Sequence, residues 1–159
     1  MVETVAAELI EVVEATASEL RSLDENLVRA RPAPGKWSIQ EIVGHLMDSA
    51  VNNHHRFVRA QETDPLVFPG YEQDNWVNAQ GYNHSSWREL VELWRLYNGH
   101  LAQLMRRIPQ QKLAVECRIG PYDPVTLEFL VEDYLAHLKH HLQQVENIRL
   151  SAKAQGAQS

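Results

Sequence analysis

The chain has 159 residues, of which 44% are hydrophobic and 23% are charged, and its formal net charge is -6. These values are typical of one globular domain with its own core, and the negative charge argues against nucleic acid as the main partner. Because Cys117 is the only cysteine, no intramolecular disulfide can form, and we expect a cytoplasmic protein. No apolar run approaches the roughly 18 residues of a membrane span, so we expect no membrane association.

The first half of the chain predicts two helices. Apolar residues recur every three or four positions over about residues 2–29, and Pro32 follows this segment and stops it. A second helix is predicted from Ser38 to about Glu62. Its start carries a capping box, in which the Ser38 side chain caps the backbone of Glu41 and the Glu41 side chain reaches back.

Residues 63–85 contain two prolines and two glycines without a sustained period, so we predict a long connection of the kind that often carries function. A third helix is predicted from a cap at Ser86 to Pro109. Residues 110–125 are irregular and can accommodate a short strand pair. The fourth helix is predicted from a cap at Thr126 to about Arg149.

Four amphipathic helices of roughly 20 residues without a long strand predict an all-α fold, a four-helix bundle. We expect residues 1–150 to form this single domain and residues 151–159 to be a frayed tail. The long connections between helices two and three, and between three and four, allow a crossover topology.

The fourth helix contains His137, His140 and His141. On a helical wheel His137 and His141 share one side, one turn apart, while His140 faces away. Two imidazoles at this spacing can bind one metal ion. The commoner reading of such a motif is a buried histidine hydrogen-bonded to a carbonyl, and a tetrahedral ion would also need a third protein ligand.

Candidates for the third ligand lie in the second helix, at His45, His54 and His55. Periodicity alone favours His54 as the inward residue. His45 instead belongs to a polar stripe that flanks the apolar face, and the fourth helix carries a matching stripe. If the two stripes faced each other they would line a polar cleft, so the wheel permits His45 as a ligand without selecting it. The stripes comprise His45, Ser49, Asn52 and Arg56 on one helix and Asp133, His137 and Gln144 on the other.

Two stretches resemble signatures of the DinB/YfiT-like family. Residues 35–50, GKWSIQEIVGHLMDSA, are similar to the second-helix signature of that family, and residues 137–148, HLKHHLQQVENI, to its fourth-helix signature. The order and spacing of segments also match over about residues 5–150. The resemblance implies a four-helix bundle that holds a divalent metal, zinc or nickel, through three histidines. Carried over by position, these ligands are His45, His137 and His141.

The resemblance also implies a homodimer and a function. Characterised members use a low-molecular-weight thiol, as bacillithiol S-transferases and mycothiol-dependent maleylpyruvate isomerases do, and others are named metal-dependent hydrolases. Three neutral imidazoles with an open fourth position describe a catalytic site, because a metal makes bound water or thiol a nucleophile at neutral pH. We therefore expect a thiol S-transferase acting on a small molecule with a thiol cosubstrate. The alternatives are a metal-dependent hydrolase and a non-catalytic metal-binding or stress-response bundle.

Three further residues are candidates for supporting roles, and none is assigned a catalytic role. Asp133 lies one turn before His137 and either orients that imidazole or is a solvated surface carboxylate. Ser49 is near the helix-two histidine. Arg56 either receives a substrate carboxylate or pairs with an acidic neighbour. In the long connection, Asp74 and Trp76 are candidates to cap the cleft, although packing over the core is favoured for Trp76. Cys117 is predicted to be a buried thiol rather than a nucleophile.

Overall fold

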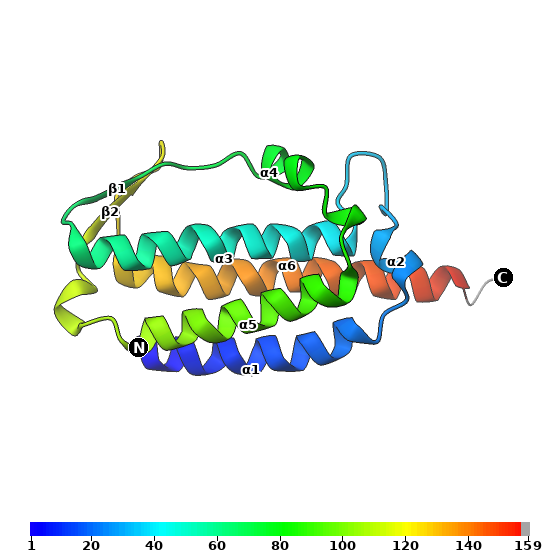
Figure 1. Ribbon diagram of the computed structural model, residues 1–159, viewed down its shortest axis with the longest axis horizontal. Coiled ribbons are helices and arrows are strands. Elements are labelled where there is room, and N and C mark those ends of the chain that lie inside the picture. The colour runs from blue at the N-terminus through cyan, green and yellow to red at the C-terminus, as the bar shows by residue number, and fades with distance from the viewer. Residues whose placement is uncertain (157–159) are drawn as a thin grey trace.

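The computed structural model describes residues 1–156. Four long helices form the bundle (Figure 1): α1 (Val2–Arg21), α3 (Ile39–Glu62), α5 (Trp87–Arg106) and α6 (Leu127–Gly156). Each of α1 and α3 packs against both α5 and α6. The predicted four-helix bundle is therefore confirmed. α1 lies diagonally across the bundle from α3, and α5 from α6, whereas α3 and α5 are neighbours.

The helix directions explain the long connection between α3 and α5. In Figure 1, α1 and α6 run one way along the bundle, and α3 and α5 run the opposite way. Because α3 and α5 point in the same direction, the chain must return along the bundle between them. We call residues 63–86 the crossover connection. It contains β1 (Leu66–Phe68), α4 (Gln73–Gln80) and the 3-10 turn η1 (Tyr82–His84).

A small sheet lies where the crossover connection leaves α3. Strands β2 (Glu116–Ile119) and β3 (Val125–Thr126) form the expected antiparallel pair between α5 and α6, after the turn η2 (Gln110–Lys112). Strand β1 adds to β2 in parallel, with Leu66 opposite Cys117. The sheet order β1-β2-β3 thereby joins the two long connections. The parallel strand was not predicted from the sequence.

The first predicted helix, residues 2–29, is in fact two helices. α1 ends at Arg21, and a short helix α2 (Glu25–Arg29) follows after a break. Asp24 causes the restart, because its side chain accepts hydrogen bonds from the backbone N–H groups of Asn26 and Leu27. The apolar period runs through the break and therefore conceals it.

The last helix begins as predicted but ends later. The backbone N–H of Phe129 donates to Thr126 Oγ1 at 3.1 Å, which confirms the cap. α6 continues past the predicted end near Arg149 to Gly156, so residues 151–156 belong to the helix. Alanine, lysine and glutamine favour the helix until glycine is reached. The rest of the predicted tail, residues 157–159, lies outside the described part of the chain.

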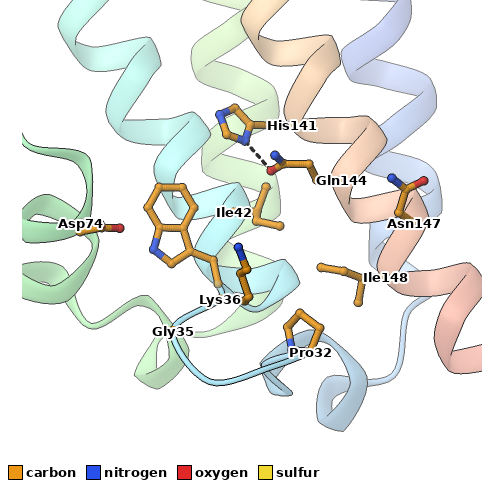
Figure 2. Close-up of a pocket in the computed structure, with 10 residues that line it drawn as sticks. Pro32, Gly35, Lys36, Ile42, Asp74, His141, Gln144, Asn147 and Ile148 are labelled. Carbon is orange, nitrogen blue, oxygen red and sulfur yellow. Dashed lines mark hydrogen bonds between the residues drawn. The ribbon is translucent and has the colours of Figure 1, made fainter.

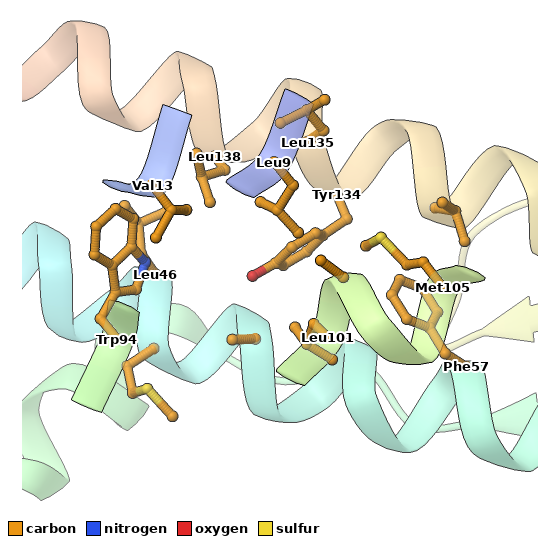
Figure 3. Close-up of a cluster of buried hydrophobic side chains, with 14 of the residues drawn as sticks. Leu9, Val13, Leu46, Phe57, Trp94, Leu101, Met105, Tyr134, Leu135 and Leu138 are labelled. Carbon is orange, nitrogen blue, oxygen red and sulfur yellow. The ribbon is translucent and has the colours of Figure 1, made fainter. Parts of the chain in front are cut away.

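All four long helices contribute to the hydrophobic core. Figure 3 shows its centre, where Leu9 and Val13 of α1 face side chains of the other three helices. The partners drawn there are Leu46, Phe57, Trp94, Leu101, Met105, Tyr134, Leu135 and Leu138. Within residues 1–156, no helix has both the length and the apolar character that crossing a bilayer requires.

Candidate metal centre

Three histidines from two helices come together inside the bundle. His45 lies on α3, and His137 and His141 lie on α6; we call them the histidine trio. Nε2 of His137 is 3.3 Å from Nε2 of His45 and 3.1 Å from Nε2 of His141. One ring nitrogen from each side chain falls within 4.8 Å of the others. Nitrogen ligands of a tetrahedral zinc ion, at about 2.0–2.1 Å from the metal, are about 3.3 Å apart, so the two separations that involve His137 match those of such an ion.

The capping box at the start of α3 fixes the place of His45. Ser38 Oγ accepts from the backbone N–H of Glu41, and the Glu41 carboxylate accepts from the backbone N–H of Ser38. His45 then falls two turns into the helix, fully buried, with the Trp37 ring centroid 4.8 Å from its own. The capping box was predicted from the sequence and is confirmed.

The helical period favoured His54 as the inward histidine of α3, but the fully buried histidine is His45. His54, which the wheel favoured, is half-buried, and its Nδ1 pairs with the Tyr97 hydroxyl at 2.7 Å; His55 is exposed. A helical wheel assumes one buried and one solvated face. In α3 every residue from Ile39 to Ala50 is buried, because the crossover connection covers the polar side of the helix. His45 is buried on the side that the wheel treats as exposed, where Trp37 and the two histidines of α6 lie against its ring.

Burial keeps the trio neutral. Removal from water, with smaller effects of the neighbouring imidazoles, lowers the pKa of His45 to about 3 and the pKa of His137 to about 4. Burial also lowers the pKa of His141. At pH 7 all three rings are uncharged and each has a nitrogen lone pair, which is the form that binds a metal ion.

Gln144 holds His141 in one tautomer. Its side-chain oxygen Oε1 lies 2.9 Å from His141 Nδ1, and Figure 2 shows this contact as a dashed line. An amide oxygen only accepts hydrogen bonds, so Nδ1 carries the proton and Nε2 presents its lone pair to the trio. The sequence placed Gln144 on the polar stripe but gave it no role. Because Gln144 lies one turn after the candidate ligand His141 on the same helix, the sequence could have indicated that its side chain contacts that imidazole.

The other predicted site residues lie near His137. Ser49 is buried, with Oγ 3.5 Å from His137 Nδ1. Asp133 is exposed and, within residues 1–156, makes no hydrogen bond to His137. Of the two predicted roles, a solvated surface carboxylate therefore describes it better than a group that orients His137. Arg56 and Asp133 both line the cavity that His137 reaches.

Two cavities adjoin the trio from different sides. We call the first the Trp37 cavity; it has a volume of about 400 Å³, contacts His141 and is mostly apolar (Figure 2). The second, the Arg56 cavity, has a volume of about 270 Å³ and contacts His137. The crossover connection lines both, through Asp74 in the first and through Gly70, Tyr71 and Gln73 in the second.

The crossover connection is fastened to α3 close to the trio. Asp48 Oδ1 accepts hydrogen bonds from the Tyr82 hydroxyl at 2.6 Å and from Gln80 Nε2 at 2.7 Å. Asp48 is buried, and this burial raises the pKa of its carboxyl group. Trp76, expected to pack over the core, is instead 37% exposed, with its ring centroid 5.0 Å from that of Tyr71.

These features define a four-helix bundle with a buried cluster of three neutral histidines flanked by two cavities. The family model of the DinB superfamily matches residues 3–145. The chain therefore belongs to the DinB superfamily, as its sequence signatures predicted.

Proteins from Bacillus are similar to this chain in sequence at low identity. The chain is 25% identical over 120 residues to "Putative metal-dependent hydrolase YfiT" of Bacillus subtilis, covering 72% of this chain and 65% of YfiT. A Bacillus cereus protein, also named "Putative metal-dependent hydrolase", is 26% identical over 150 residues, covering 94% of this chain and 86% of the relative.

Solved structures agree on the fold. YfiT of Bacillus subtilis superposes with a TM-score of 0.78 at 19% identity, covering 93% of this chain and 87% of YfiT, and is described as having "an unusual four-helix bundle topology". The DinB-like protein YjoA of Bacillus subtilis superposes with a TM-score of 0.64 at 13% identity, covering 96% of this chain and 92% of YjoA.

Proposed function

We propose that the histidine trio holds a divalent metal ion, zinc or nickel, and that the protein is a metal-dependent enzyme. The observation that carries this proposal is the convergence of three neutral imidazoles from two helices, with one nitrogen of each within 4.8 Å of the others and His137 Nε2 at 3.3 and 3.1 Å from its two neighbours. Three protein ligands leave one coordination position open, which is the mark of a catalytic rather than a structural site. When bound, such an ion supplies Lewis acidity that lowers the pKa of a coordinated water or thiol.

The residues of the chain prepare this site in distinct ways. Gln144 fixes the proton of His141 on Nδ1, away from the trio. Ser49 lies beside the corresponding nitrogen of His137 and restricts its rotation. The Trp37 ring covers His45 and keeps bulk water from that side of the cluster.

Hydrolysis is the reaction that the names of the Bacillus relatives support. In this reading the nucleophile is water, and the substrate occupies the cavity next to the open position. The chain itself then needs only to orient the substrate and exclude excess water.

Thiol transfer is the second candidate, and the two cavities favour it. A hydrolase needs room for one organic substrate, whereas a transferase must bring a thiol and an electrophile to the same centre. The Trp37 cavity reaches the trio at His141 and the Arg56 cavity reaches it at His137. This arrangement gives each of two substrates its own approach.

Turnover assays with matched variants test the proposal. Metal-loaded protein is assayed for hydrolysis of nitrophenyl esters, and for transfer of cysteine to a chlorodinitrobenzene electrophile. We expect one of the two activities to depend on added zinc or nickel, to be lost in His137→Ala and to be retained in His140→Ala, because His140 is exposed. Metal binding without either activity would favour the non-catalytic metal-binding bundle. The homodimer and the cytoplasmic location stay predictions.

A further inference from the structure

We propose that the Arg56 cavity is a subsite for the carboxylate group of a monoanionic substrate, and that the Arg56 guanidinium receives this group beside the metal centre. The place of this subsite in the reaction rests on the proposed function. The binding of the carboxylate depends only on residues of the cavity, so it can be measured with and without metal.

Arg56 is a half-buried cation that forms no ion pair with a carboxylate of residues 1–156. Within residues 1–156, none of the ion pairs involves Arg56, although most other arginines of the chain have a carboxylate within 4.0 Å. Its Nε is buried and has no hydrogen-bond partner. Asp133 lines the same cavity and acts on the Arg56 charge only from beyond ion-pair distance. Burying a cation without a partner in contact is costly, so Arg56 is suited to an anion that enters the cavity.

The surroundings of Arg56 hold the guanidinium in place rather than neutralise it. Asn53 Nδ2 donates to the backbone oxygen of Ser49 at 2.9 Å, which leaves Asn53 Oδ1 to accept a long contact of 3.5 Å from Arg56 Nη1. The Phe68 ring centroid lies 5.8 Å from Arg56 Cζ. An amide oxygen and an aromatic ring position a guanidinium without cancelling its charge.

The charge pattern of the cavity favours a single carboxylate over a phosphate. Arg56 is the one arginine or lysine among the residues that line the cavity, and Asp123 and Asp133 line it as well. A dianion such as phosphate would meet one cation and two carboxylates. A monoanionic carboxylate matches the planar fork of one guanidinium, which can bind both of its oxygens.

The remaining walls define the rest of the substrate. Apolar and aromatic side chains form most of them, which suits a carboxylate attached to a small apolar or aromatic group. These side chains are Tyr71, Ile119, Tyr122, Val125, Phe129, Leu130 and Tyr134. Because His137 lines the same cavity, a carboxylate on Arg56 would place the attached group near the trio.

Calorimetric titration with acetate and benzoate tests the proposal, with benzamide as the neutral control and inorganic phosphate as the dianion. Each titration is run on metal-free and zinc-loaded protein, and the zinc content is measured separately. We expect the wild-type protein to bind benzoate at millimolar concentrations or below, more tightly than benzamide or phosphate, in both forms.

Substitutions then locate the binding group. Arg56→Gln should weaken benzoate binding by about tenfold to a hundredfold, and Arg56→Lys should restore part of the loss. Arg59→Gln removes the same charge from an exposed position on the same helix and should leave the affinity unchanged. Circular dichroism verifies that each variant is folded.

Two results would overturn the proposal. One is the absence of acetate and benzoate binding by wild-type protein. The other is equal affinity in wild type and Arg56→Gln, which would place the carboxylate on the metal or elsewhere. If the protein takes up no zinc but benzoate still binds through Arg56, the subsite stands and the proposed metal-dependent function fails.

Discussion

The aromatic ring of Tyr82 lies directly against the backbone of Gly44, the residue before His45. A side-chain carbon built on Gly44 would lie 2.1 Å from Tyr82 Cδ2, closer than any real contact. The absence of a side chain at Gly44 lets Tyr82 pack here and reach Asp48 with its hydroxyl group. This contact clamps the crossover connection over the buried stretch of α3 that carries His45.

Gly44→Ala should therefore destabilise the protein. The methyl group displaces the Tyr82 ring and disturbs its hydrogen bond to Asp48, and overpacking of this kind costs about 1–3 kcal/mol. Urea unfolding measures the change in the free energy of unfolding. The matched control is Gly99→Ala on α5, where the new methyl group meets no atom within 4 Å. Alanine at that site should stabilise the helix by about 0.5–1 kcal/mol, and equal effects of the two substitutions would refute the steric explanation.

Gln144→Ala should weaken metal binding without removing a ligand. Without the Gln144 oxygen, His141 can place its proton on either ring nitrogen and rotate away from the trio. Loss of such an orienting partner typically costs tenfold to a hundredfold in metal affinity, and we expect about this range. Competition with a chromogenic chelator measures the zinc affinity.

The neighbouring Gln143 provides the control for this substitution. Its side chain is exposed and donates to Asn147 Oδ1 rather than to a histidine. Gln143→Ala should leave the zinc affinity unchanged. An unchanged affinity in Gln144→Ala as well would show that His141 needs no orienting partner.

Cys117 should be unreactive in the native protein. The residue is fully buried on β2, and this burial is the main cause that raises the pKa of its thiol to about 11. The thiolate is the reactive form, so at pH 8 almost all of the thiol is protonated, and reactivity should rise only as the pH approaches 11. Alkylation by iodoacetamide at pH 8 should be about a hundredfold or more slower than in urea-unfolded protein. Rapid alkylation of the native protein would make Cys117 a candidate nucleophile again.

The bundle could be read from the sequence because its signals are local. The capping box at Ser38 and Glu41 and the apolar period predict α3 to its last residue, Glu62. Asp24 is the N-cap residue that starts α2 after the break, but the apolar period continues through the break, so the period alone predicts one uninterrupted helix. The parallel pairing of β1 with β2 joins segments far apart in sequence, and no local pattern encodes it.

The histidine trio could be predicted only in part. The spacing of His137 and His141 on one helix is a local signal and was sufficient to pair them. The choice of His45 over His54 depends on which side of α3 packs against Trp37 and the histidines of α6, which is a tertiary fact that a helical wheel cannot contain. The resemblance to the DinB/YfiT-like signatures supplied His45 instead. The buried Nε of Arg56, which has no hydrogen-bond partner within residues 1–156, is likewise visible only in the folded chain.

The central claim is that the trio binds a metal ion, and elemental mass spectrometry of protein purified without a histidine tag tests it most directly. We predict about one zinc or nickel ion per chain in wild type and in His140→Ala, and loss of that ion in His141→Ala. Wild-type protein that contains no metal, and takes up none when zinc or nickel is added, would contradict the account.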